Sequence, residues 1–217
     1  MIAKSLQKWV LNLHSMSYTL SGYLAITLND GMHPKHRIMK YKEWFVDNIE
    51  KGCTVLDVGC NTGTMPEVMS QKAGYVYGIE IVEKHIQEAI EKHQQPNIEF
   101  ICDDATTYDY SNCKAIDLVT LSNVLEHIED RVRFLEKLSI QIKWKDKKRF
   151  LIRVPMIDRE WIAIYKKELG LEYRLDRTHF IEYTYDSFVR ELEESNVNII
   201  SSHIRFGEIY AICEVKE

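Results

Sequence analysis

The strongest constraint on the fold is an alternation of short apolar runs with helical segments in the middle of the chain. Five runs rich in β-branched and aromatic residues are separated by segments whose apolar residues recur with helical spacing. The predicted strands are 54–58, 75–80, 97–104, 115–124 and 149–155, and the predicted helices are 64–72, 82–93 and 130–143. Strands that alternate with helices of this length predict an α/β fold with a parallel, doubly wound sheet and helices on both faces.

The segments on either side of this alternation have other patterns. Residues 2–13 and 35–49 have helical spacing, and residues 14–34 between them are expected to be irregular or partly helical. Residues 156–183 are too long for a plain connection and predict an insertion on the substrate side, with a helix over 160–169. A helix over 184–195 and two strands, 198–205 and 208–215, follow. Strands that turn so tightly, near Gly207, are antiparallel neighbours.

These patterns predict one domain over residues 1–217. Its expected parts are an N-terminal helical cover (1–50), a ligand-binding core (51–155), the insertion (156–183) and a C-terminal helix with a strand pair (184–217).

Composition narrows the functional class. The net charge is −5, from 28 basic and 33 acidic residues, which argues against a nucleic-acid partner. Five cysteines without a CxxC pair indicate reduced thiols and a cytoplasmic protein, and no Cys/His spacing predicts a metal site. No apolar run reaches the ~18 residues of a membrane span, and no signal peptide is recognisable at the N-terminus.

The turn Gly59-Cys60-Asn61-Thr62-Gly63 follows the first predicted strand. Ligands of doubly wound sheets bind at the carboxyl ends of the strands, and the first such turn is the usual nucleotide corner. Glu80 ends the second strand, 21 residues after Gly59. Its carboxylate can accept hydrogen bonds from both hydroxyls of a ribose. The alternative is a carboxylate favoured by the dipole of the following helix.

The dinucleotide pattern GxGxxG is broken in this turn. Its second and third glycines would fall on Asn61 and Thr64, and no Gly-Lys-Ser/Thr follows. The second glycine of that pattern lets the backbone approach a pyrophosphate. Its absence therefore favours an adenosine ligand with a different tail. Asparagine tolerates a left-handed backbone, so the shape of the turn is expected to persist.

Four motifs in register resemble those of class I S-adenosylmethionine-dependent methyltransferases. They are VLDVGCNTG (55–63), GIE (78–80), FICDDA (100–105) and IDLVTLSNVLEHIED (116–130). The last resembles the version found in the small-molecule, ubiquinone-biosynthesis-like branch (methyltransferase type 11), and the resemblance extends from Val55 to Pro155. It implies S-adenosyl-L-methionine as cofactor and a Rossmann-like, mostly parallel seven-stranded sheet whose last strand is antiparallel.

The resemblance also implies roles for individual residues. Gly59 and Gly63 would shape the turn around the amino-acid end of the cofactor, with Asn61 offering a further hydrogen bond. Asp57 would anchor the ammonium group, or would only tie the loop together. Glu80 would bind the ribose.

The adenine and methionine parts of the cofactor would meet other residues. The family has an acidic residue just before a small one near the adenine amino group, so Asp104, followed by Ala105, is favoured over Asp103. Ile81 would pack on the adenine face. The backbone of Asn123 and Val124 would line the methionine part.

Two histidines are candidates for the catalytic base. His127 lies just beyond the fourth strand, near the expected position of a methyl acceptor, and a neutral imidazole can take the acceptor's proton. The alternative is that His127 only holds its loop. His179, in the insertion, is a second candidate, because DRTHFIEYT is loosely similar to a stretch in glycan and natural-product methyltransferases.

Two further segments have both a functional and a structural interpretation. The basic residues of 29–45 could meet the cofactor's carboxylate or could form a solvated helix face; they include His33, His36, Arg37 and Lys40. The aromatic and basic residues in and near the insertion could line an acceptor pocket or could be core; they include Arg153, Arg159, Trp161, Tyr165, Tyr173, Arg174, Arg177 and Tyr183.

The predicted function is methyl transfer from S-adenosylmethionine to a small-molecule or saccharide acceptor. In-line displacement of this kind depends mainly on positioning, with a general base optional. Two alternatives remain open at this point: a protein or nucleic-acid methyltransferase, and a non-catalytic cofactor-binding regulatory subunit.

Overall fold

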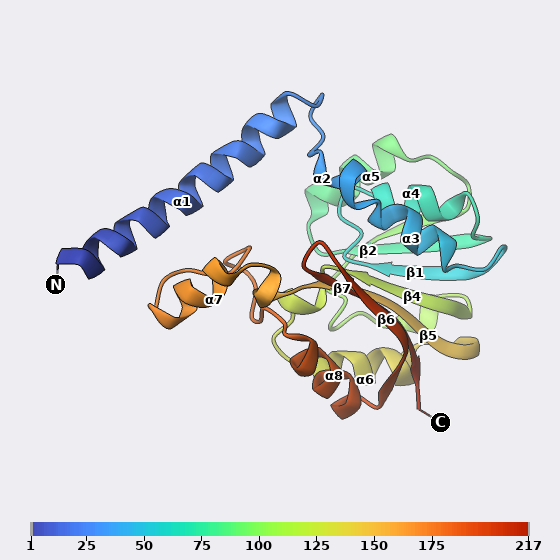
Figure 1. Cartoon of the computed structure of the whole chain (residues 1–217). Helices are drawn as coiled ribbons and strands as arrows, with labels where there is room; N and C mark the ends of the chain where they lie inside the picture. The colour runs from blue at the N-terminus through green and yellow to red at the C-terminus, as the bar shows by residue number, and fades with distance from the viewer. Residues whose placement is uncertain (1, 217) are drawn as a thin grey trace.

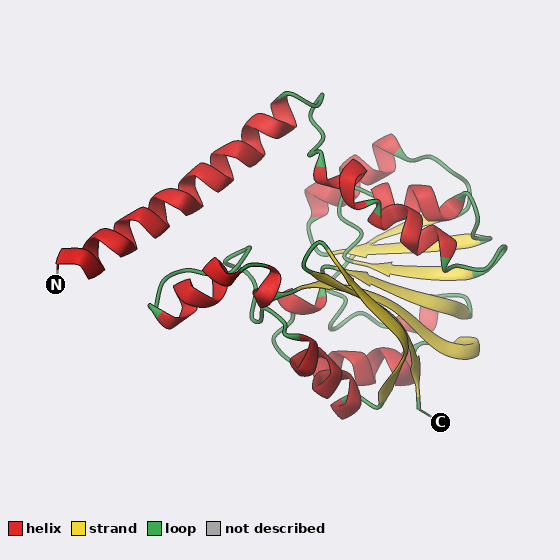
Figure 2. Cartoon of the chain, viewed as in Figure 1, coloured by secondary structure: helices red, strands yellow, loops and turns green. Residues whose placement is uncertain are grey.

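The computed structural model describes residues 2–216 as a seven-stranded sheet between layers of helices (Figures 1 and 2). The strands are β1 Thr54–Val58, β2 Tyr75–Glu80, β3 Ile98–Cys102, β4 Ile116–Ser122, β5 Trp144–Pro155, β6 Val197–Arg205 and β7 Glu208–Val215. Their order is β3-β2-β1-β4-β5-β7-β6. The neighbours from β3 to β5 pair in parallel, and β7 is antiparallel to both β5 and β6. The predicted fold class is therefore confirmed.

Helices cover both faces of the sheet. The α-helices are α1 Ile2–Thr27, α2 Lys35–Met39, α3 Tyr41–Asp47, α4 Thr64–Ser70, α5 Glu83–Lys92, α6 Arg131–Gln141, α7 Trp161–Glu168 and α8 Tyr185–Glu194. Short 3₁₀ turns are η1 Tyr110–Asn112, η2 Leu125–His127 and η3 Ile157–Arg159. Figure 1 shows α3, α4 and α5 on one side of the sheet and α6 and α8 on the other. Each side has its own apolar core: Phe45 and Met69 belong to one cluster, and Leu138 and Phe188 to the other.

The parallel pairing brings the carboxyl ends of the central strands to one edge of the sheet. β1 lies between β2 and β4, so Asp57 is in register with Gly78 on one side and Thr120 on the other. The loops that carry the sequence motifs leave the sheet at this edge.

The N-terminal region differs from its prediction in two places. Helix α1 continues to Thr27, although residues 14–34 were expected to be irregular or partly helical. No proline interrupts it before Pro34, and hydroxyl groups along it, such as that of Thr19, donate to carbonyls four residues earlier. The predicted helix 35–49 is divided into α2 and α3 at Lys40, whose φ of 50° is left-handed and ends the regular hydrogen bonding. None of the helices between residues 2 and 216 combines the length and the apolar composition that a membrane crossing requires.

The turn after β1 has three residues in the left-handed region. The φ angles are 70° at Gly59, 48° at Asn61 and 81° at Gly63. Asn61 thus adopts the backbone that sequence analysis expected it to tolerate, and its Oδ1 accepts a hydrogen bond from the Thr62 N–H at 2.8 Å. Gly63 is more constrained, because a Cβ atom there would lie 2.8 Å from both His93 and Phe100.

This packing makes Gly63→Ala a test of the turn. We expect it to destabilise the protein more than Gly170→Ala does, because Gly170 has a similar φ of 67° but open space around its Cβ position. The left-handed backbone alone costs about 1–2 kcal/mol for alanine, and only Gly63 adds the steric conflict. Denaturant unfolding of the two variants measures the difference. Equal losses would mean that the side chains of His93 and Phe100 yield freely.

Candidate functional site

An open cavity of about 1340 Å³ lies at the carboxyl edge of the sheet. It is lined by the loops after β1, β2, β3 and β4 and by one face of α6. The predicted site residues that line it are Gly59, Asn61, Glu80, Ile81, Asp104, Ala105, Asn123, Val124 and His127. Asp57, Gly63 and His179 are not in the lining. Most of the residues chosen from the motifs are therefore brought to one cavity, as the parallel sheet requires.

Asp57 is buried beneath the β1 loop. Its side chain is 2% exposed, and its Oδ1 accepts a hydrogen bond of 2.6 Å from the Thr120 hydroxyl on β4. Its Oδ2 is buried without a hydrogen-bond partner. Burial raises the pKa of Asp57 to about 7, which the hydrogen bond from Thr120 only partly offsets. This carboxylate would gain from a cation placed near Oδ2.

Glu80 joins the first two loops. Its carboxylate accepts hydrogen bonds from the Asn61 N–H at 3.1 Å and from the Val82 N–H at 3.0 Å. The first bond holds the β1 turn against the end of β2, and the second satisfies a donor at the start of α5. The two interpretations made from the sequence are thus compatible, because the side chain serves the helix start and still lines the cavity.

Two aspartates follow β3 at the wall of the cavity. Asp104 accepts from the N–H and the hydroxyl of Thr106, at 2.8 and 2.7 Å, and Asp103 accepts from the Asp104 N–H at 2.7 Å. Both line the cavity, so geometry does not separate them. Ile81 is 63% exposed and offers an apolar surface nearby.

His127 ends η2 at another part of the cavity wall. Its Nδ1 is 2.9 Å from the hydroxyl of Thr178, a residue of the insertion that also lines the cavity. The ring of His179 stands edge-on to it, with centroids 4.6 Å apart. Burial, and then the charge of His179, lower the pKa of His127 below its ordinary value. The imidazole is therefore neutral at neutral pH.

Glu126 is a residue that sequence analysis missed. Its side chain is 1% exposed, both carboxylate oxygens are buried without a partner, and burial raises its pKa to about 8. The sequence offered one indication of this residue, a carboxylate among the apolar residues of VLEHI. Carboxylates are rarely buried without a partner, so a buried one at this position suggests a functional role.

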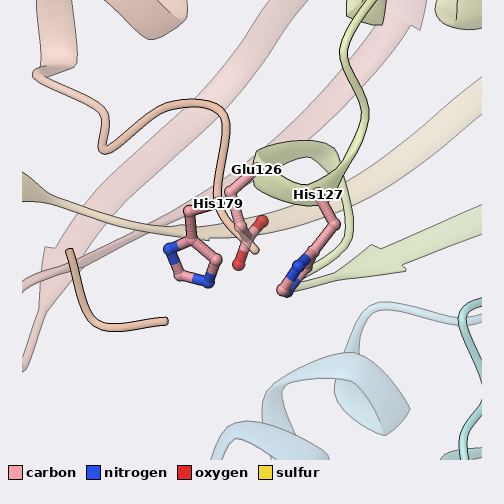
Figure 3. A group of neighbouring side chains, drawn as sticks. All are labelled: Glu126, His127 and His179. Carbon is pink, nitrogen blue, oxygen red and sulfur yellow. The ribbon is translucent and has the colours of Figure 1, made fainter. Parts of the chain in front are cut away.

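Glu126, His127 and His179 converge on one space (Figure 3). Their potential ligand atoms all lie within 4.8 Å of one another, a spacing that could hold a metal ion. His179 Nδ1 is 2.8 Å from Glu182 Oε1, which leaves Nε2 free to bind. No metal site was expected here from the sequence, because the two histidines come from segments far apart in the chain and show no ligand spacing.

Several other basic and aromatic residues form internal contacts. Arg159 pairs with the buried Glu182 at 2.7 Å, Arg153 forms a buried pair with Glu208, and Tyr183 is fully buried. For these residues the core alternative holds. Within the described part of the insertion, only Thr178 is in the lining of the cavity.

The basic segment before β1 is partly buried, because His36 packs against Tyr41. His36 Nδ1 is 2.7 Å from the Tyr41 hydroxyl, and burial lowers the pKa of His36 to about 4. This histidine is therefore neutral and does not supply the expected cation.

Comparisons with known proteins agree with this geometry. The model of the family described as "Methyltransferase domain" matches residues 56–143. The ubiquinone biosynthesis O-methyltransferase of Coxiella burnetii is 28% identical over 166 residues, which cover 75% of this chain and 69% of that protein.

Solved structures share the fold. A SAM-dependent methyltransferase from Aquifex aeolicus superposes with a TM-score of 0.62 at 16% identity, covering 84% of this chain and 93% of the other. Magnesium protoporphyrin IX methyltransferase from Synechocystis PCC 6803, crystallised with S-adenosylhomocysteine (SAH), gives 0.62 at 19% identity, covering 84% and 83%.

The four motifs in register, the sheet order and the matched methyltransferase domain lead to one conclusion. The chain carries a methyltransferase domain over residues 56–143 and is an S-adenosylmethionine-dependent methyltransferase, with S-adenosylmethionine as its cofactor.

Proposed function

We propose that this enzyme methylates a small-molecule acceptor, most simply at a hydroxyl group, with a saccharide intermediate as one candidate. The observation that carries the proposal is that His127, a neutral imidazole, lines the same cavity as the cofactor motifs. The similarity to an O-methyltransferase that is named for ubiquinone biosynthesis supports the same class of acceptor.

The residues at the β1 and β2 ends fit the polar parts of the cofactor. Asp57 has a buried oxygen without a partner, which suits the ammonium group of the methionine part. Glu80 keeps acceptor capacity beyond its two backbone donors, which suits the ribose hydroxyls. Gly59, Asn61 and Gly63 give the turn its left-handed shape around that end.

Neighbouring residues of the cavity lining suit the nucleobase and the region of the sulfonium. Ile81 offers an apolar surface for adenine, and Asp104, beside Ala105, is our choice for the amino group. Asn123 and Val124 line the cavity and are our choice for the methionine part. The side-chain Oδ1 of Asn123 is buried without a hydrogen-bond partner. When bound, the cofactor supplies a methyl group already activated on a sulfonium.

His127 is our candidate for the general base. Thr178 bonds to its Nδ1 and so fixes the ring, which leaves Nε2 to accept a proton from the acceptor. The buried carboxylate of Glu182 holds His179 in turn. The ring of His179 packs edge-on against that of His127 and so helps to orient it. His179 is 5% exposed, so its proposed role is to support His127.

A second mode of acceptor activation is favoured by the convergence of Glu126, His127 and His179. A divalent ion held by these groups would neutralise the buried carboxylate and lower the pKa of an acceptor hydroxyl bound to it. The two modes differ in their dependence on metal, so one assay separates them.

The experiment that tests the proposed function is a cofactor-turnover assay over a metabolite library that includes phenols, catechols and saccharides. Methylated products are identified by mass spectrometry. A small-molecule product supports the proposal. Tight cofactor binding with no turnover across the library would favour a regulatory subunit or a macromolecular acceptor instead.

Glu80→Ala should weaken binding of S-adenosylmethionine by about 10- to 100-fold, because hydrogen bonds to a charged group contribute about 1.5–3 kcal/mol. Isothermal titration calorimetry measures the change. Glu83→Ala is the matched control, since Glu83 is an exposed carboxylate at the start of α5 and outside the cavity lining. Equal affinities for the two variants would remove Glu80 from the ribose site.

Cofactor binding should also tighten as pH rises. Asp57 in the free enzyme has a pKa of about 7, and an ammonium group beside it would lower that value. Binding below pH 7 therefore releases a proton, and affinity should rise roughly tenfold between pH 5.5 and 7.

Calorimetry in two buffers of different ionisation enthalpy counts the proton released. Asp57→Asn should bind more weakly and should show neither the release nor the pH dependence. A wild-type affinity that is flat with pH would contradict contact between Asp57 and the ammonium group.

His127→Ala should lower turnover of the identified acceptor by about 10²–10⁴-fold while the dissociation constant of the cofactor stays within twofold. Thr178→Ala should lower turnover less, because it frees the ring without removing it. Both are compared after EDTA treatment and after addition of Mg²⁺, Mn²⁺ or Zn²⁺. Activity that needs a metal and is lost in Glu126→Gln would assign the ion mode; full activity of His127→Ala would exclude both.

A further inference from the structure

Helix α1 presents a stripe of large apolar side chains along one face. The stripe residues are Ile2, Leu6, Trp9, Leu13, Met16, Leu20 and Tyr23. They follow one another at alternating intervals of four and three residues, which is the 3.5-residue repeat of a coiled-coil seam. Their exposed fractions run from 48% at Leu13 to 86% at Ile2. The repeat is sustained over the whole helix and has no covering element among the described residues.

The opposite face of α1 makes the contact with the rest of the chain. Leu11 is 3% exposed, and the Ser15 hydroxyl accepts a hydrogen bond of 2.8 Å from Lys166 of α7. Residues four apart share one face of a helix, and this face points away from the stripe. Figure 1 shows α1 extending from the sheet and its helices, next to α7. The attachment therefore leaves the stripe available.

Charge favours a second copy of this chain over a lipid surface. The only lysines of α1 are Lys4 and Lys8, both in its first two turns, and the helix has no acidic or arginine residue. An interfacial helix is typically rich in basic residues along its polar face, whereas this stripe continues far beyond the two lysines. Neither lysine lies in the seam or directly beside it, so two seams can meet without charge repulsion.

The available area is that of a stable interface. A standard interface buries roughly 800 Å² per partner, and seven large side chains with these exposed fractions offer an area of that order. Val10 and Leu24, 47% and 55% exposed, widen the stripe beside the seam.

We propose that α1 pairs with α1 of a second copy of this chain, seam against seam, and that the enzyme is a dimer through this helix. The stripe is self-complementary, as a two-fold interface requires. None of the described residues of α1 lines the cofactor cavity, so pairing leaves cofactor binding intact.

The test is molar mass by light scattering after size exclusion, together with sedimentation over a dilution series of the full chain. The wild type should have twice the mass of one chain at tens of micromolar and should fall toward one chain on dilution. Leu13→Glu with Leu20→Glu should be monomeric. Far-UV circular dichroism and cofactor binding, both unchanged, verify that this variant is folded.

Tyr18→Glu is the matched control. Tyr18 is a large side chain of the same helix, 67% exposed, but it lies on the Leu11 face outside the seam. This variant should remain dimeric. The proposal is overturned by a monomeric wild type over the whole concentration range, by equal dissociation of Tyr18→Glu, or by a monomer that instead cosediments with phosphatidylglycerol vesicles.

Discussion

The hydrogen bond between Asp57 and Thr120 lies at the centre of the site. It crosses from β1 to β4 and satisfies one oxygen of a carboxylate that is otherwise buried without a partner. The parallel register that aligns these two residues also brings the carboxyl ends of β1, β2 and β4 to one edge. A buried carboxylate with a pKa of about 7 costs stability when ionised. A cationic ligand would offset that cost. The unpaired carboxylate thus lowers the stability of the free protein but favours binding of such a ligand.

The gathering of the motif residues at one cavity could be predicted because its determinants are local in the sequence. Buried strands are recognised in the sequence by their apolar composition. Parallel pairing then brings the carboxyl ends of the strands to one edge of the sheet. Glu80 was found by its distance from the β1 turn, and the left-handed backbone of Asn61 followed from the few residues that tolerate it. These inferences needed only the residue pattern of the motifs and the parallel topology of the sheet, and no knowledge of side-chain packing.

The side of the cavity around His127 depends on packing that no local pattern encodes. His127 and His179 meet because the Phe180 N–H donates to the Glu126 carbonyl and Glu182 fixes the loop around His179. From the sequence, Arg159 could bind a ligand or pair with a buried carboxylate. The fold shows that its partner is Glu182. The expected end of the first helix was also wrong, because the helix continues to Thr27 through residues expected to be irregular or partly helical.

The two sides of the cavity are therefore built on different principles. The side that we propose for the cofactor uses backbone turns and single carboxylates at strand ends. The side that we propose for the acceptor uses residues 156–183, which fold around the buried Glu182 and bring Thr178 to the cavity wall. Changes in that segment can alter Thr178 and His179 without moving β1 or β2. Under the proposed function, acceptor choice and cofactor binding would then depend on different parts of the chain.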